Sequence, residues 1–365
     1  MRVGVVVLLD KEGRRGGAER LFDGLVGALN SAGANAEIVP VVGDEASFGA
    51  IQETYLECYD LDLSAFDGVV STKAPTYAVR HPNHVCYLVH TMRVFYDMFE
   101  HAFPRPTESA LKHQQVIRKL DTAAMSPARL RGLYCIGREV AERLALYNGL
   151  DARVLHPGTN LALRPGPFGD YFLVPGRLHE WKRVGLILEA FTRTNLDCRL
   201  LICGTGEQEA ELREMASEDG RVEFLGAVSD SELIDLYAGC LAVVFAPVRE
   251  DFGYVALEAF LSAKPVVTCT DSGEPVRLTQ HGVTGLVCEP TAREIAKAMR
   301  LIASDRHAAE KMGRRALENV AGITWGSVAS TLLDELFDKG GVSGQETDRG
   351  SNETNALPAS SDLKI

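Results

Sequence analysis

The sequence predicts an α/β protein built from two doubly wound domains, each with a mostly parallel sheet. Short apolar runs typical of buried strands alternate with runs of helical period along almost the whole chain. A segment rich in proline and glycine, around residues 157–169, interrupts this alternation, which then restarts. The 365 residues suffice for two cores, at about 150 residues per domain.

In the first half, a strand is expected at 2–9, followed by a glycine-bearing loop and a helix at 21–33. Further strand-like runs lie at 36–42, 66–75 and 84–91, and residues 105–150 are expected to be helical. The second half repeats the pattern with the strand-like runs YFLVPGRL, CRLLICG, VEFLG, LAVVFAP and PVVTC, each followed by a turn or a helix. Each loop after a strand therefore lies at the carboxyl end of a parallel sheet.

The expected domain organisation follows from these patterns. A first domain spans 1–160 and a second spans 161–323. An amphipathic helix follows at 324–338, and the polar tail at 339–365, rich in Gly and Ser, is expected to be disordered.

Charge and cysteine content narrow the class of protein. A formal net charge of −12 argues against a protein that coats nucleic acid, so no nucleic-acid partner is expected. The eight cysteines are scattered without a CxxC pair, which favours reduced, buried thiols over a zinc site. Reduced thiols in turn favour a cytoplasmic location. The apolar run at the N-terminus is too short to span a membrane and no cleavage site follows, so a first strand is favoured over a signal peptide.

Candidate ligand residues follow two strands of the second domain. Arg177 and Lys182 come directly after a strand, with Arg183 beside them, and such cations can clamp the oxygens of a diphosphate. The alternative is a set of solvated surface cations. Gly204 and Gly206 follow the next strand, where missing side chains would let backbone approach a ligand. The third glycine of a dinucleotide fingerprint and a Walker-type lysine are both absent there.

The stretch PVREDFGYVALEAF carries two acids, Glu250 and Glu258, on either side of a glycine-centred turn. Gly253 and Tyr254 are expected at the N-terminus of a helix, where free amides and the helix dipole favour a phosphate. A carboxylate accepts two hydroxyl hydrogens, which suits a ribose diol or a sugar ring. The alternative is one capping acid and one surface acid.

The first domain offers fewer candidates. Gly16 and Gly17, in the loop after the first strand, would face the cleft across from the second domain. His90 ends an apolar run and could donate a hydrogen bond to a sugar hydroxyl, although a histidine in such a run is commonly structural.

Taken together and in this order, these motifs resemble the family 4 glycosyltransferases, retaining enzymes with the GT-B fold. The resemblance covers nearly all of residues 1–338 and is most specific in VPGRLHEWKR, in LLICGTGEQEAEL and in the E-x7-E of PVREDFGYVALEAF. HPNHVCYLVHTMRVFYD is similar to the segment that carries the cleft histidine in that family. The resemblance implies two Rossmann-like domains facing a cleft, with the helix at 324–338 crossing back to the first domain.

The resemblance also assigns roles. Arg177 and Lys182 would hold the donor diphosphate, Glu258 the ribose hydroxyls and Glu250 the transferred sugar, with His90 near the reaction centre. The remaining donor-binding residues that the resemblance implies are Gly16, Gly17, Gly204, Gly206, Val228 (for the base, through its backbone), Phe252, Gly253, Tyr254 and Val255.

The implied reaction moves a sugar from a nucleoside-diphosphate sugar to a carbohydrate or lipid-linked acceptor with retention, in synthesis of bacterial cell-envelope polysaccharide or glycoconjugate. No DxD-like pair is present, so neither a metal nor another cofactor is expected. A non-catalytic nucleotide-sugar-binding module and a glucan synthase-like transferase remain alternatives. A nicotinamide-dependent oxidoreductase should show a complete GxGxxG near its first strand, and LLDKEGRRGGAER does not.

Two further features bear on partners and substrate. Residues 105–143 hold eight Arg or Lys against four Asp or Glu, which suggests either peripheral contact with an anionic membrane or a solvated helical face. Similar sequences often read D-S-G-G-P-x-E where this chain has Glu274 and Arg277. This substitution predicts either an unusual donor or a loop that does not bind the ligand.

Overall fold

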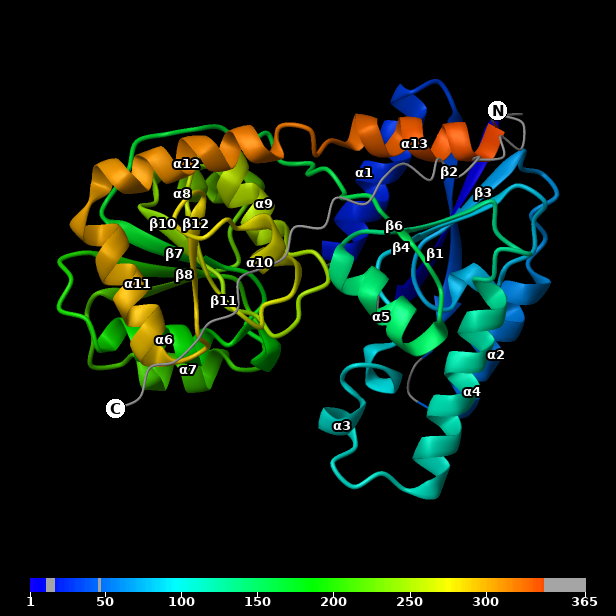
Figure 1. Cartoon of the computed structure of the whole chain (residues 1–365), viewed down its shortest axis with the longest axis horizontal. Coiled ribbons are helices and arrows are strands. Elements are labelled where there is room, and N and C mark those ends of the chain that lie inside the picture. Colours follow the sequence, from blue (N-terminus) through cyan, green and yellow to red (C-terminus); the bar gives the residue numbers. More distant parts are fainter. Residues whose placement is uncertain (11–16, 45–46, 338–365) are drawn as a thin grey trace, which may run out of the picture.

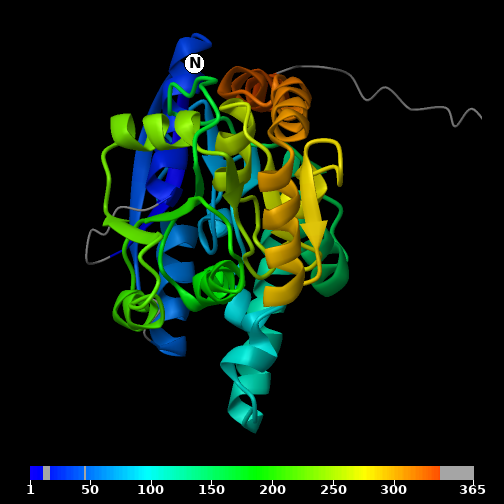
Figure 2. The ribbon, with the colours of Figure 1, turned by 90° about the vertical axis from the view of Figure 1, so that its left-hand side faces the viewer.

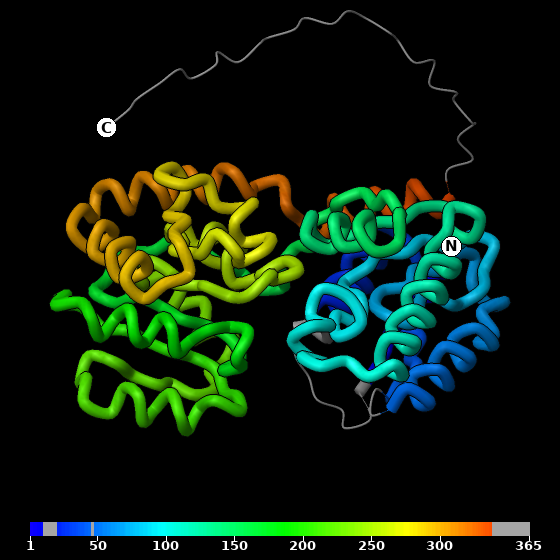
Figure 3. Tube along the Cα trace, turned by 60° about the horizontal axis from the view of Figure 1, so that its bottom comes forward, coloured from blue at the N-terminus to red at the C-terminus, as the bar shows by residue number. Residues whose placement is uncertain are grey.

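The computed structural model describes residues 1–10, 17–44 and 47–337. They form two lobes, each built on a six-stranded parallel sheet (Figure 1; Figure 3). The strand orders are β2-β1-β3-β4-β5-β6 and β12-β11-β10-β7-β8-β9. The predicted fold class, α/β with two doubly wound parallel sheets, is confirmed. Gly16 and the tail at 339–365 lie outside the described residues.

The first lobe is built around β1, whose valines are wholly buried because helices cover both faces of the sheet. Its strands are β1 (Arg2–Asp10), β2 (Asn35–Gly43), β3 (Gly68–Ser71), β4 (His84–Leu88), β5 (Gly132–Cys135) and β6 (Arg153–Val154). Its helices are α1 (Gly17–Ser31), α2 (Phe48–Asp60), α3 (Phe99–Ala102), α4 (Glu108–Ala124) and α5 (Arg138–Asn148), with 3-10 turns η1 (Thr76–Ala78) and η2 (Arg93–Phe95).

The expectation of one helical stretch over 105–150 is wrong in part, because strand β5 separates α4 from α5. That strand has only four residues, too few for an alternating pattern to stand out from the flanking helices. Its carboxyl end leads directly into α5, whose N-cap is Gly137. This places the start of α5 at the same edge of the sheet as the loop after β4.

The second lobe follows the predicted alternation closely. Its strands are β7 (Tyr171–Pro175), β8 (Arg199–Cys203), β9 (Val222–Gly226), β10 (Ala242–Val244), β11 (Val266–Cys269) and β12 (Gly285–Cys288). Its helices are α6 (Val184–Thr192), α7 (Glu209–Met215), α8 (Asp230–Gly239), α9 (Tyr254–Leu261), α10 (Glu274–Leu278), α11 (Ala292–Ser304) and α12 (Arg306–Val320), with the 3-10 turn η3 (Glu180–Lys182).

The chain passes between the lobes twice. After α12, helix α13 (Trp325–Phe337) lies on the first lobe against α1 (Figure 1). The Trp325 indole donates to Asn160 Oδ1 at 2.7 Å, and the Asn160 amide donates to the Arg20 carbonyl at 2.6 Å. The two crossings are therefore joined to each other and to α1.

One part of the first lobe projects away from the body. Figure 2 shows α3 and the adjoining end of α4 extending beyond both sheets. The side chain of Thr107 caps α4 by accepting a hydrogen bond from the Ala110 amide at 3.1 Å. Across the described ranges, no helix is both long enough and apolar enough to cross a membrane.

Candidate active site

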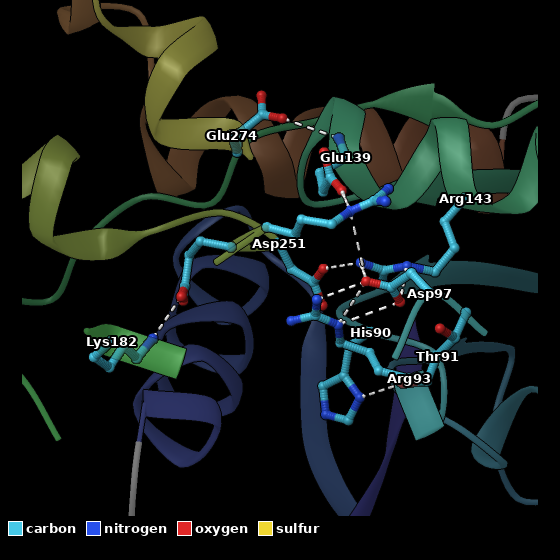
Figure 4. Close-up of polar contacts among 11 residues, drawn as sticks. His90, Thr91, Arg93, Asp97, Glu139, Arg143, Lys182, Asp251 and Glu274 are labelled. Carbon is cyan, nitrogen blue, oxygen red and sulfur yellow. Dashed lines mark hydrogen bonds and ion pairs between the residues drawn. The ribbon is translucent and has the colours of Figure 1, made fainter. Parts of the chain in front are cut away.

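A lysine–glutamate ion pair lies where the two lobes meet. Lys182 ends η3 after strand β7, and Glu250 follows strand β10, the neighbour of β7 in the sheet. The Lys182 Nζ and Glu250 Oε2 atoms are 2.5 Å apart, and the side chains are 28% and 24% exposed (Figure 4). Both charged groups are thus accessible to a ligand while neutralising each other.

The backbone holds Glu250 firmly in place. Its amide donates to the Ser272 carbonyl at 3.0 Å, and its carbonyl accepts from the Glu274 amide at 2.9 Å. Gly273 has a φ of +76°, and a Cβ there would lie 2.5 Å from the Glu250 carbonyl oxygen. Only glycine therefore fits where these two loops touch.

The predicted turn opens helix α9. Gly253 is its N-cap, with a φ of +81°, and a Cβ at this position would lie 2.7 Å from Pro275 Cγ. The amides of Tyr254 and Val255 belong to the first turn, where an α-helix offers no internal acceptor, so they suit an anion. Phe252 is buried beside them.

Glu258 lies one turn further along α9, away from the ion pair. The Tyr237 hydroxyl donates to its Oε2 at 2.8 Å, and Arg20 of the first lobe pairs with the nearby Asp230 at 2.7 Å. Burial raises the pKa of the Glu258 carboxyl to about 7, and the hydrogen bond from Tyr237 and the charge of Arg20 oppose this only in part. A carboxylate so placed gains from ligand hydroxyls that donate to it.

The raised pKa of Glu258 predicts that the stability of the folded protein depends on pH. Since the pKa of Glu258 rises from 4.5 to about 7 on folding, the folded protein loses stability as pH increases through this interval. Compared with that of Glu258→Gln, the free energy of unfolding of the wild type should fall by about 3 kcal/mol as the pH rises from 4.5 to above 7. Below pH 4.5 this decrease should be absent. Urea unfolding of both proteins across this range measures it, and parallel pH profiles would contradict the burial argument.

The structure does not bring Arg177 to Glu250. The Arg177 guanidinium lies 3.3 Å from Glu207 and is 64% exposed. Arg183 has its own partners, because it binds Asp271 through two nitrogens and donates to the Ala246 and Pro247 carbonyls. Of these three cations, Lys182 is therefore the one that lies at Glu250.

Gly204 and Gly206 have a role in packing. A Cβ at either position would collide with the carbonyl oxygen of Gly176 or Leu178, and the Leu178 amide donates to Thr205 at 3.0 Å. Their missing side chains thus let the loops after β7 and β8 lie against each other. Sequence reasoning expected the space to serve a ligand.

Val228 lies beside a recess at the end of β9 with a volume of about 470 Å³. The apolar part of its lining comes from Tyr171, Leu225, Ala227, Val228 and Leu236, and the acidic part from Glu232 and Asp235. An apolar recess with a few polar groups suits a flat ring such as a base.

The first lobe contributes His90, which follows β4. Its Nδ1 lies 3.0 Å from the Thr91 carbonyl oxygen (Figure 4). Asp251 approaches from the second lobe. Burial opposes ionisation of Asp251, but the Arg143 guanidinium at 2.6 Å and nearby Arg93 hold its pKa below the usual value. Gly17, also predicted to face the cleft, is the first residue of α1.

Sequence reasoning missed the charged cluster around this acid. Asp97 accepts from Arg93 at 2.6 Å and pairs with Arg143 at 2.8 Å, and the side chains of Asp97 and Arg143 are fully buried (Figure 4). Arg143 lies in the middle of α5, where nothing in its own sequence neighbourhood marks it. The sequence feature that could have indicated this cluster is Asp251, which directly follows Glu250 in a loop after a strand.

Metal ligands are a separate question. Within residues 1–10, 17–44 and 47–337, no group of three or more His, Cys, Asp or Glu side chains is arranged to hold a metal ion.

Comparisons with known proteins bear on this geometry. The family model described as "Glycosyl transferases group 1" matches residues 169–319. A D-inositol 3-phosphate glycosyltransferase of Kribbella flavida is 28% identical over 275 residues, covering 67% of this chain and 64% of that protein. The mouse alpha-1,3/1,6-mannosyltransferase ALG2 is 37% identical over 123 residues, covering 33% of this chain and 28% of that protein. The chain thus spans less than two thirds of both relatives.

Solved structures resemble the whole of both lobes. Sucrose-phosphate synthase from Thermosynechococcus elongatus superposes with a TM-score of 0.71 at 17% identity, covering 91% of this chain and 97% of that one. Anabaena HepE in complex with UDP and glucose gives 0.70 at 17% identity, covering 92% and 99%. The chain therefore has the GT-B fold, and its residues 169–319 match the family model of the glycosyl transferases group 1.

Proposed function

We propose that this protein is a retaining glycosyltransferase that moves a sugar from a nucleoside-diphosphate sugar to an acceptor hydroxyl. The observation that carries the proposal is the Lys182–Glu250 ion pair beside the N-terminus of α9. A cation, an acid and a helix N-terminus then converge where a diphosphate and a sugar would meet. The residues that match the group 1 family model contain all three.

The proposed mechanism is mainly electrostatic. As the bond to the sugar breaks, the departing diphosphate gains negative charge, which Lys182 and the first amides of α9 stabilise. A bound phosphate competes for the Lys182 ammonium and frees Glu250 to accept hydrogen bonds from the sugar. Arg177 joins the phosphates by leaving Glu207, which costs little because that pair is exposed. His90 approaches the sugar from the first lobe.

The nucleoside would occupy the other side of α9. Glu258 accepts the ribose hydroxyls, and Val228 meets the base at the recess after β9. The solved complexes of Anabaena HepE contain UDP or UDP-glucose, and the Kribbella relative is named for a phosphorylated inositol. The UDP complexes support a nucleotide-sugar donor, and the inositol name supports a hydroxylated acceptor. We propose that this acceptor is either a free carbohydrate or a lipid-linked one.

A thermal-shift series tests the donor directly. Each of several nucleotide sugars, built on UDP, GDP or ADP, is added at increasing concentration to the full chain. A ligand at 100 times its dissociation constant should stabilise the protein by about 2.7 kcal/mol. We expect one nucleotide series to raise the melting temperature, and Lys182→Gln to lose most of the shift at the same ligand concentration. No shift with any nucleotide sugar would refute the proposed donor class.

We also propose that the reaction needs no metal and no other cofactor, because Lys182 and the α9 amides supply the positive charge. Transfer should proceed unchanged in EDTA. Activity that EDTA abolishes and Mg²⁺ or Mn²⁺ restores would contradict this proposal.

The projecting α3–α4 arm supports a location at the inner face of the membrane, where a lipid-linked acceptor of cell-envelope synthesis would be found. The exposed surface of α4, the longer helix of this arm, combines Lys112 and Lys119 with the apolar side chains of Leu111, Val116 and Leu120. We expect the protein to pellet with vesicles that contain anionic lipid at low salt, and Lys112→Glu/Lys119→Glu to remain in the supernatant. Lys311→Glu, on α12, is the control. Failure of the wild-type protein to pellet removes the membrane from the proposal.

A further inference from the structure

The two residues that depart from the expected D-S-G-G-P-x-E pattern, Glu274 and Arg277, point toward the first lobe. They lie on α10, directly after the loop that is hydrogen-bonded to Glu250. Figure 4 shows Glu274 reaching Glu139 at the start of α5. Their side chains therefore contact a helix of the opposite domain.

Glu274 supplies a cap that α5 lacks. The N-cap of α5 is Gly137, which has no side chain to accept a hydrogen bond from the first turn. Glu274 Oε2 accepts from the Glu139 amide at 3.1 Å, and its Oε1 lies 2.8 Å from His156 Nε2. A Cβ at Gly137 would lie 3.0 Å from the Glu274 carboxyl carbon. The second lobe thus fills the space that a side chain at position 137 would take.

Three ion pairs join α5 to α10 and to the loop that contains Glu250. Arg277 pairs with Glu142, Arg249 with Glu139 at 2.8 Å, and Asp251 with Arg143 at 2.6 Å. Glu274 is only 2% exposed, so its contacts are protected from water and salt. Breaking a buried charged contact from one side is costly because it leaves the other group without a partner.

These contacts reach the candidate active site through the backbone. Residues 249 and 250 are hydrogen-bonded to residues 271, 272 and 274 at 2.9 to 3.0 Å, so α10 and Glu250 move together. Any change in the seating of α10 on α5 is therefore a change in the position of Glu250 relative to His90 of the first lobe.

We infer that Glu274 and Arg277 are positioning residues that dock α10 on α5 and so fix the angle between the lobes and the place of Glu250. They act through the backbone of Glu250 and touch no substrate. The docking of α10 on α5 is inferred from the structure alone, while its effect on glycosyl transfer rests on the proposed function.

Small-angle X-ray scattering of the full chain without ligand tests the docking. Glu274→Gln and Arg277→Glu should each give a larger radius of gyration than the wild type, and Arg277→Glu/Glu142→Arg should restore the wild-type curve. Arg213→Glu, which breaks a pair with Glu209 within α7, is the matched control and should change nothing. The swap keeps the test decisive if Glu274→Gln fails to fold. Superimposable curves for wild type and Arg277→Glu would overturn the inference.

Transfer kinetics test the link to Glu250. We expect Arg277→Glu to lower kcat by about tenfold to a hundredfold, as a displaced catalytic group would, with little change in KM for the donor. The charge swap should recover most of kcat. An unchanged kcat beside an expanded scattering curve would overturn the positioning role. A wild-type protein without transfer would contradict the proposed function and leave the scattering result standing on its own.

Discussion

Replacing Glu250 with glutamine should lower the rate of glycosyl transfer by at least about a hundredfold, while the protein still folds. Glutamine keeps the shape of the side chain but loses the charge that pairs with Lys182 and the second acceptor oxygen for sugar hydroxyls. The loss should appear in kcat, measured with the donor that the thermal-shift series identifies.

Glu214→Gln is the matched control, because Glu214 is an exposed acid at the end of α7. Its kinetics should equal those of the wild type. If Glu250→Gln retained full kcat, the ion pair would be a structural contact.

Replacing Lys182 with glutamine should weaken binding of the nucleoside diphosphate by about a hundredfold, because a charged group that faces phosphate oxygens is lost. Isothermal titration calorimetry with the diphosphate alone isolates this effect from the sugar. The variant also leaves Glu250 without its 2.5 Å partner, so the acid repels the phosphates.

The double variant Lys182→Gln/Glu250→Gln separates these two contributions. Because the two side chains are in direct contact, their effects on diphosphate binding should not add, and the double variant should bind more tightly than Lys182→Gln alone. Lys297→Gln, on an exposed face of α11, is the control. Strictly additive effects would contradict a shared role of the pair at the diphosphate.

The sequence predicted the fold class because alternation is a local property. Buried β1 and the strands of the second lobe are short apolar runs, each followed by turn residues, and nothing distant was needed to recognise them. The four-residue β5 was missed since its apolar run is short and lies between two helices, α4 and α5. The turn at Gly253 was found for the same local reason, as a glycine between a strand and a helix.

Contacts between distant residues were out of reach. Lys182 and Glu250 are 68 positions apart and were assigned to different parts of the donor, yet they pair directly in the structure. Arg143 and Asp251 come from opposite lobes, so no local pattern could join them. The substitution at Glu274 was visible in the sequence, but its partner, the uncapped start of α5, became apparent only in three dimensions.

If the Lys182–Glu250 pair catalyses sugar transfer with retention, the product keeps the anomeric configuration of the donor. The most direct measurement is proton NMR of a reaction that contains the full chain, the identified nucleotide sugar and a panel of carbohydrate and lipid-linked acceptors. We expect a new glycosidic signal with the same anomeric configuration as the donor, together with release of the nucleoside diphosphate, and neither from Glu250→Gln. Donor binding without turnover would show a binding module, and a product of inverted configuration would contradict the proposed chemistry.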